Sequence, residues 1–111
     1  MSLKPREVLA KFPDHFPSWF GEYLQENLHV YAEIERLALQ ATRRLNHYGI
    51  DMVVGTIRWT SATAEVGTEY KISNEAAAYF ARLFHFQHPA HRIFRMKQTR
   101  VERANNVQPP Q

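Results

Sequence analysis

The sequence predicts one small, mainly α-helical domain with a small β-hairpin or extended segment, arranged as a compact helix-turn-helix or winged-helix-like unit. Three observations predict this class. Apolar residues repeat at helical spacing in two stretches, 30–45 and 76–84. A short connection at 47–50 joins the first stretch to another apolar segment, as in a helix-turn-helix. Residues 65–73 contain spaced apolar residues and a glycine, which favours a hairpin or a single extended piece.

Length and composition restrict the class further. A chain of 111 residues fits one domain, and 44% apolar residues are enough for it to fold. The absence of cysteine excludes a disulfide scaffold and a thiolate nucleophile. The longest apolar run, 76–81, is too short to cross a bilayer, and the N-terminal residues lack the apolar core of a signal peptide. We therefore expect a soluble cytoplasmic protein with no membrane association.

The first seventeen residues are predicted to form an N-terminal arm. Pro5 suits the first turn of a short helix that runs to about Phe12, with Val8 and Leu9 on the same side. Residues 12–17 contain two further prolines and are expected to be irregular, with their phenylalanines docked on the domain body.

The domain proper is expected to span residues 18–100. Ser18 is a plausible N-cap for a short helix that contains Trp19 and Phe20 and ends near Asn27. Asn27 is then expected to cap a long helix that Gly49 terminates after Tyr48. One apolar stripe identifies this helix: Val30, Ile34, Leu37, Ala38, Ala41 and Leu45.

Residues 50–64 permit two interpretations. Asp51 could cap a helix over 51–62, and the short connection before it favours this choice. The valines, isoleucine, tryptophan and threonines are also strand formers, and Gly55 weakens a helix by about 1 kcal/mol relative to alanine.

The last third of the domain contains a second clear helix. Asn74 is expected to cap it, and Pro89 is expected to stop it near His88. Its buried face is predicted to consist of Ala76, Ala77, Phe80, Leu83 and Phe84. A short final element would be anchored by Ile93, Phe94 and Met96, and residues 101–111 are expected to form an unpacked C-terminal tail.

Several stretches resemble a family of small phage and prophage proteins that are described as helix-turn-helix or winged-helix-like. These stretches are ENLHVY at 26–31, IRW at 57–59, YKISN at 70–74, ARL at 81–83, HP at 88–89 and IFR at 93–95. The resemblance implies that fold over roughly residues 22–100, most of the chain. The family usually carries more charge just before the IRW stretch, where this chain has Asp51, Gly55 and Thr56. That difference argues against base reading by this segment.

Positive charge is concentrated near the C-terminus. Residues 92–103 contain five basic side chains and one acidic one, whereas residues 1–91 contain nine basic and ten acidic side chains. A local excess of this kind is typical of a phosphate-binding strip or of a site for an acidic protein, and equally of a solvated end.

Double-stranded DNA is the partner that the sequence favours. If 51–62 is a recognition helix, its polar side chains can reach base edges, while cations before and after it can hold phosphates. The candidate nucleic-acid-binding residues are Arg43, Arg44, Thr56, Arg58, Lys71, Arg95, Lys97 and Arg100. Arg82, which lies on an otherwise apolar helix, is expected to form a structural salt bridge instead.

No pattern of residues indicates an enzyme. His85, His88 and His91 have metal-like spacing, but Pro89 interrupts the helix and no cysteine or carboxylate lies nearby to complete a zinc site. The serines lack the flanking glycines of a nucleophile elbow, and the four glycines are too dispersed to form a phosphate-cradling loop. We therefore expect no catalytic residue, no metal and no cofactor.

Two other roles remain open. The near-neutral body and the aromatic-rich stretch 12–20 would suit a protein-binding module, such as a phage inhibitor or adaptor that acts on a host protein. A homodimer with a structural role is a further alternative.

Overall fold

Six helical segments follow one another in residues 3–43 and 74–110, the parts of the chain that the computed structural model describes. They are α1 (Pro5–Lys11), the 3₁₀-helix η1 (Pro13–His15), α2 (Phe20–Glu26), α3 (Leu28–Ala41), α5 (Asn74–Gln87) and α6 (Arg100–Ala104). No β-strand occurs in these two ranges, so the mainly helical class is confirmed. The predicted helix over 51–62, its connection at 47–50 and the hairpin at 65–73 lie outside the described residues.

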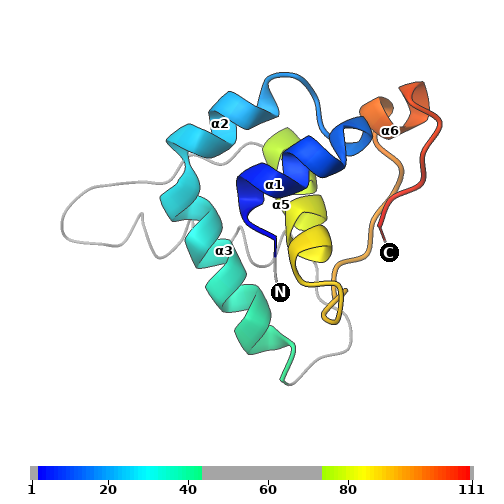
Figure 1. Ribbon diagram of the computed structural model, residues 1–111. Helices are drawn as coiled ribbons and strands as arrows, with labels where there is room; N and C mark the ends of the chain where they lie inside the picture. The colour runs from blue at the N-terminus through cyan, green and yellow to red at the C-terminus, as the bar shows by residue number, and fades with distance from the viewer. Residues whose placement is uncertain (1–2, 44–73, 111) are drawn as a thin grey trace.

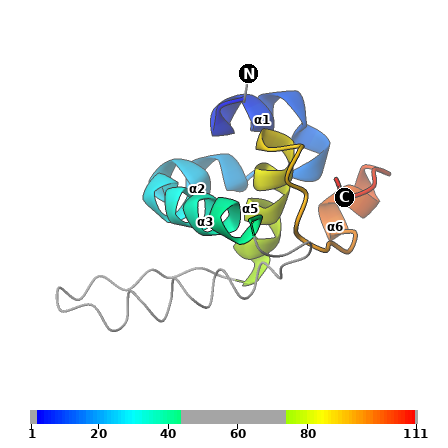
Figure 2. The ribbon, with the colours of Figure 1, turned by 90° about the horizontal axis from the view of Figure 1, so that it is seen from below.

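Helix α5 is the centre of the domain. It contacts α1 and α3, and the chain that follows it runs back along a different side of it from α3 (Figures 1 and 2). The buried apolar residues of α5 are Ala76, Ala77, Tyr79, Phe80, Ala81, Leu83 and Phe84. The prediction of a single buried face was therefore too narrow, because a helix that is covered from several sides is apolar nearly all round.

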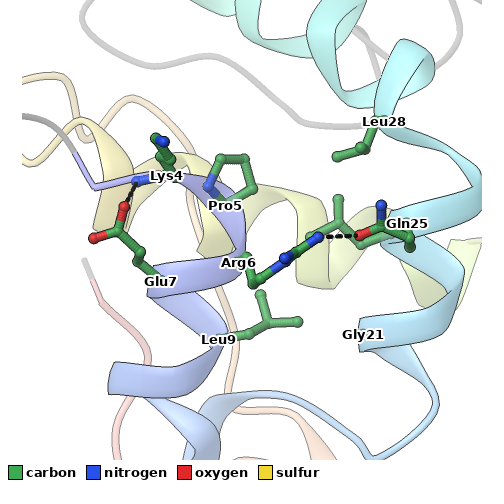
Figure 3. A pocket seen from close by; sticks show the side chains of 9 residues that line it. Lys4, Pro5, Arg6, Glu7, Leu9, Gly21, Gln25 and Leu28 are labelled. Carbon is green, nitrogen blue, oxygen red and sulfur yellow. Dashed lines mark hydrogen bonds between the residues drawn. The ribbon is translucent and has the colours of Figure 1, made fainter.

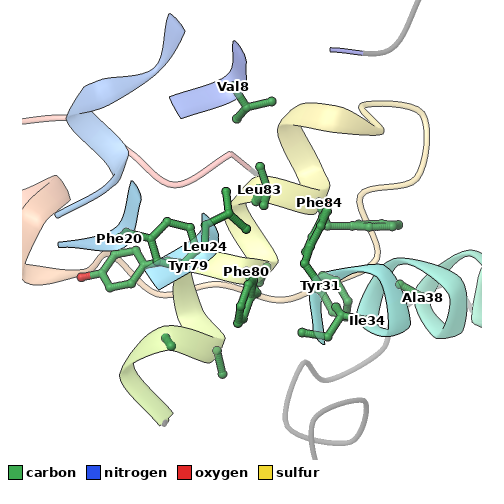
Figure 4. Packing of buried hydrophobic residues seen from close by; sticks show 14 of the residues in the cluster. Val8, Phe20, Leu24, Tyr31, Ile34, Ala38, Tyr79, Phe80, Leu83 and Phe84 are labelled. Atoms are coloured by element: carbon green, nitrogen blue, oxygen red, sulfur yellow. The ribbon is translucent and has the colours of Figure 1, made fainter. Parts of the chain in front are cut away.

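One hydrophobic core joins the described helices. Phe80 of α5 is fully buried and lies edge-on to Phe20 of α2, with 5.4 Å between ring centroids, and parallel to Tyr31 of α3 at 5.9 Å. Val8 of α1 and Ile34 of α3 are also fully buried in this cluster (Figure 4). Each such side chain contributes roughly 1.5–3 kcal/mol through removal of its apolar surface from water.

The phenylalanines of the N-terminal arm pack on the domain as predicted, but Pro13–His15 form the 3₁₀-helix η1 where an irregular segment was expected. Helix α1 begins with Pro5 at its first position, where no backbone N–H is needed, and buries Val8. Phe12 stacks on Phe86 of α5 with 4.0 Å between centroids, and Phe16 is only 7% exposed. The phenylalanines of the arm therefore belong to the core.

Neither of two predicted N-cap side chains, those of Ser18 and Asn27, caps the helix that follows it. Ser18 is not a cap, because α2 begins at Phe20, whose N–H donates to the Pro17 carbonyl. Asn27 does lie at the cap position of α3, but its side-chain amide donates to the Tyr23 carbonyl of α2 at 2.8 Å. The Asn27 side chain therefore caps the C-terminal end of α2. At the start of α3 only the backbone of Asn27 takes part, because its carbonyl accepts the Val30 and Tyr31 N–H groups.

Helix α3 ends at Ala41, earlier than the predicted end at Tyr48. The Thr42 hydroxyl donates to the Leu39 carbonyl at 2.7 Å, and the Arg43 N–H bonds to the Gln40 carbonyl in a tightened last turn. Because the Leu39 carbonyl is the acceptor that a continuing helix would use for Arg43, this side chain competes with continuation.

The C-terminal residues are packed, so the prediction of an unpacked tail is wrong. Asn106 adopts a left-handed conformation (φ 56°) just after α6, and the N–H groups of Asn106 and Val107 bond to the Arg103 and Glu102 carbonyls. This Schellman motif reverses the chain so that it returns toward α5 (Figure 1). Pro110 is buried there, and its carbonyl accepts a hydrogen bond from His85.

Candidate nucleic-acid interface

The basic segment begins where α5 ends. The His91 N–H donates to the His88 carbonyl in a turn around Pro89, and the chain then continues in an extended form. Ile93, Phe94 and Met96 are buried, as predicted, while Arg95 and Lys97 alternate with them and are exposed. This alternation follows from the period of two of an extended chain, which holds both cations on the outer side.

Five exposed cations follow this segment into α6, and we refer to them as the basic strip. They are Arg92, Arg95, Lys97, Arg100 and Arg103. Thr99 begins α6 with a capping box, in which its hydroxyl accepts the Glu102 N–H at 3.2 Å and its own N–H donates to the Glu102 carboxylate at 3.0 Å. The cap defines the direction of α6 and hence where its two arginines lie.

The single acidic residue within the strip points inward. Glu102 is 0% exposed and accepts two hydrogen bonds from the guanidinium of Arg82, which is 2% exposed. The Nε–Oε2 and Nη2–Oε1 distances are 2.9 and 2.8 Å. Burial by itself would raise the pKa of Glu102, but hydrogen bonds from Arg82, His15 and the Thr99 N–H outweigh it and hold that pKa below its usual value. The predicted structural role of Arg82 is confirmed.

Arg82 and Glu102 also join distant parts of the chain. The Nη1 of Arg82 donates to the Ala78 carbonyl at 2.8 Å, and Nη2, which also bonds to Glu102, donates to the Lys97 carbonyl at 2.6 Å. The Nδ1 of His15 in η1 lies 2.7 Å from the Glu102 carboxylate. The backbone of the strip is therefore tied to α5 and to η1 from within, while the cations of the strip face solvent.

The three histidines with metal-like spacing have separate environments. The Nδ1–H of His85 donates to the Pro110 carbonyl at 2.5 Å, and its Nε2 accepts the Phe94 N–H at 3.0 Å, so both ring nitrogens are occupied. Burial lowers the pKa of His85, which favours this neutral form. His88 bonds to Glu35 of α3 at 2.6 Å, and His91 is exposed. No group of three metal-ligating side chains occurs within residues 3–43 and 74–110.

The structure groups some of the predicted nucleic-acid-binding residues. Arg95, Lys97 and Arg100 share the basic strip, whereas Arg43 is exposed just after α3, and α3 and the strip segment lie on different sides of α5 (Figures 1 and 2). Arg44, Thr56, Arg58 and Lys71 fall outside the described residues. Arg92 and Arg103 were missed as site residues, although they belong to the same run of positive charge.

A pattern in the sequence indicates that the Glu102 side chain is directed toward the backbone at the start of α6 and not toward the cations. The spacing Thr99-x-x-Glu102 is the capping-box pattern that marks the start of a helix. It predicts that Glu102 bonds to the backbone of Thr99 and not to a cation of the strip. Its partner Arg82 could not be found from local spacing because it lies twenty residues earlier.

Two cavities on the surface of the described residues are lined in part by α1. One, of about 750 Å³, lies between α1 and α2 and includes Leu9, Gly21, Glu7 and Arg6, and the Arg6 guanidinium reaches Gln25 at 3.3 Å (Figure 3). The other, of about 610 Å³, lies beside the ends of α1 and α5. It is lined by Leu3, Lys11, Phe12, Phe86, Gln87, Pro89 and Arg92.

Comparisons with protein-family models, with curated proteins and with solved structures return no match to this chain. Among the described residues, no helix has the length and apolar character needed to cross a membrane.

Proposed function

We propose that this protein binds the phosphate backbone of double-stranded DNA and that the basic strip is the contact surface. One observation carries the proposal: the strip presents five exposed cations, and its only carboxylate, Glu102, is buried against Arg82. Phosphate contacts supply most of the affinity of proteins for duplexes, independent of sequence. Because Glu102 pairs with Arg82 inside the protein, its negative charge does not pair with the exposed cations of the basic strip.

The shape of the strip adds support. Arg95 and Lys97 are two residues apart, and both side chains are exposed. Phe94, which precedes Arg95, and Met96, which lies between the two cations, are buried and hold the backbone against the core. Cations on an anchored backbone lose less conformational entropy on binding than cations on a free tail. The helix-turn-helix or winged-helix arrangement and the phage-type regulatory role remain predictions from the sequence.

Duplex binding measured against salt concentration tests this function. The triple variant Arg95→Gln, Lys97→Gln and Arg100→Gln should lower affinity and make the log–log salt slope less steep by about 2.7, since each phosphate contact contributes about 0.9. The matched control changes the same net charge at exposed positions away from the strip: Lys4→Gln, Arg6→Gln and Arg36→Gln. Equal losses in both variants, or no duplex binding at low salt, would reject the proposal.

A protein-binding module is the second candidate. Trp19 and Leu28 are 39% and 42% exposed, the two large hydrophobic side chains most open to solvent in the described part of the chain. The phenylalanines of the arm, by contrast, pack against α5: Phe16 is buried, and Phe12 is half-buried and stacked on Phe86. A host protein captured after nuclease treatment and lost in Trp19→Ser would favour this role over DNA binding.

A further inference from the structure

The cavity between the ends of α1 and α5 has the charge of an anion site. Two of its seven lining residues, Lys11 and Arg92, are cationic and exposed, and none is acidic. Its volume of about 610 Å³ lies within the range of about 300–1,000 Å³ that is usual for small-molecule sites. The cavity between α1 and α2 differs, because Glu7 lines it and Arg6 is engaged with Gln25.

An aromatic pair forms part of the cavity lining. Phe12 and Phe86 are stacked at 4.0 Å with 9° between their planes, and both are half-buried. The ammonium of Lys11 lies 5.7 Å from the centre of the Phe12 ring. Phe86 covers one face of the Phe12 ring, so a nucleobase would stack on the other face, beside the Lys11 ammonium, as bases stack on aromatic rings in single-strand binding sites.

Gln87 adds a polar group with a defined orientation. Its Oε1 accepts the hydroxyl hydrogen of Tyr31 at 2.6 Å inside the protein. The amide is thereby held with its oxygen toward α3, which leaves the NH₂ group as the donor that Gln87 can offer to the cavity it lines. Such a donor suits the carbonyl oxygens and ring nitrogens of a nucleobase.

The cavity is continuous with the basic strip, because Arg92 lines the one and begins the other. We propose that this cavity holds an unpaired nucleotide of the bound DNA, with its base against Phe12 and Phe86 and its phosphate between Lys11 and Arg92. The proposal rests on the proposed function and extends it. The protein would then prefer DNA with a single-stranded end or an unstacked base.

The test compares three DNA ligands by fluorescence anisotropy with the full chain. They are a blunt duplex, the same duplex with a short unpaired thymidine overhang, and the same overhang with abasic sites. The thymidine overhang should bind about tenfold more tightly than the blunt duplex, within the range measured for base–aromatic stacking. The abasic overhang should recover little of that gain, because it supplies phosphates without bases.

Two variants test whether the residues that line the cavity cause the tighter binding of the thymidine overhang. Phe12→Leu keeps an apolar side chain but removes the ring, and Lys11→Gln changes an exposed side chain with little risk to folding. Both should abolish the preference for the overhang and leave blunt-duplex affinity nearly unchanged, since neither residue belongs to the basic strip. Lys4→Gln is the matched control and should keep the preference.

The outcomes separate this inference from the proposed function. Equal affinity for blunt and overhang duplexes, or an equal gain from the abasic overhang, would overturn the cavity proposal while duplex binding stands. Displacement of the overhang duplex by micromolar thymidine monophosphate would instead identify a free nucleotide as the ligand. If the blunt duplex does not bind, the proposed function fails. In that case, oligothymidylate binding that Phe12→Leu abolishes would still support a nucleotide site in the cavity. The absence of oligothymidylate binding would overturn that site.

Discussion

Arg82 and Glu102 form a two-bonded ion pair inside the protein, although they lie twenty residues apart in the sequence. Both are almost fully buried, so each requires the other to offset the loss of hydration. The pair joins the central helix to α6 and determines which charges of the C-terminal segment reach solvent. Its neighbours, His15 and Thr99, complete the set of donors around the carboxylate.

Removal of one partner of this pair should destabilise the protein strongly. Arg82→Met leaves Glu102 buried without its main donor and should lower the free energy of unfolding by about 3–5 kcal/mol. The double variant Arg82→Met and Glu102→Leu should lose less than the two single variants together, because no charge is then buried alone. Urea denaturation of the four proteins measures this coupling.

The control for this cycle is the exposed pair of Arg36 and Glu33 on α3, joined at 2.8 Å. Arg36→Met should leave stability almost unchanged, because solvent screens both charges. Additive losses at Arg82 and Glu102 would show that the buried contact is not an interacting pair.

His85 should make stability depend on pH in mildly acidic solution. Burial keeps its pKa in the folded protein below the ordinary value near 6.5, so below that pH the unfolded chain binds a proton that the folded chain does not. The free energy of unfolding should therefore fall as the pH drops below about 6.5, by at most about 1.4 kcal/mol per pH unit. Urea denaturation at a series of pH values measures it.

A non-titrating replacement should flatten this dependence. His85→Gln can still accept the Phe94 N–H through its side-chain carbonyl, whereas His91→Gln changes an exposed histidine and should leave the slope in place. Below about pH 4.5 a further loss should follow as Glu102 is protonated, because its folded pKa lies below that ordinary value. A wild-type curve that is flat between pH 7 and 5 would contradict the buried neutral state of His85.

The C-terminal residues should contribute measurably to stability. Termination of the chain after Asn106 removes three hydrogen bonds: the Val107 N–H to Glu102, the Gln98 amide to Val107, and His85 to Pro110. At about 1 kcal/mol for each bond, the loss should be roughly 3 kcal/mol. Thermal and urea unfolding of the truncated protein measure it, with Gln98→Ala as a variant that removes only one of the three bonds. Unchanged stability would restore the prediction of an unpacked tail.

Local signals in the sequence predicted part of this fold correctly. Pro5 marked the first turn of α1, Asn27 marked the boundary between α2 and α3, and the apolar spacing from Ala76 to Phe84 marked α5. These features depend on residues within one or two helical turns of each other. The Thr99-x-x-Glu102 pattern and Asn106 after α6 are equally local, and they could have predicted the capping box and the chain reversal.

Other features were not predicted, one because of a local side-chain hydrogen bond and one because of a contact between distant residues. The stripe that continues to Leu45 predicted a longer α3, but the Thr42 hydroxyl took the Leu39 carbonyl and the helix ended at Ala41. Composition predicted that the end of the chain is unpacked, yet Pro110 is buried and its carbonyl bonds to His85 of α5. These two residues lie 25 positions apart, and neither indicates the other in the sequence.

The helical class, the starts of α1 and α3 and the position of the positive charge follow from the amino-acid sequence, because propensity, spacing and charge are properties of neighbouring residues. Which charges are exposed and which are buried follows only from the tertiary structure. It buried Glu102 against Arg82 and left five cations exposed, and it brought Lys11 and Arg92 to one cavity. The physical reason is that burial and pairing depend on which distant groups meet in the folded chain, and desolvation makes only the paired arrangement of a buried charge stable.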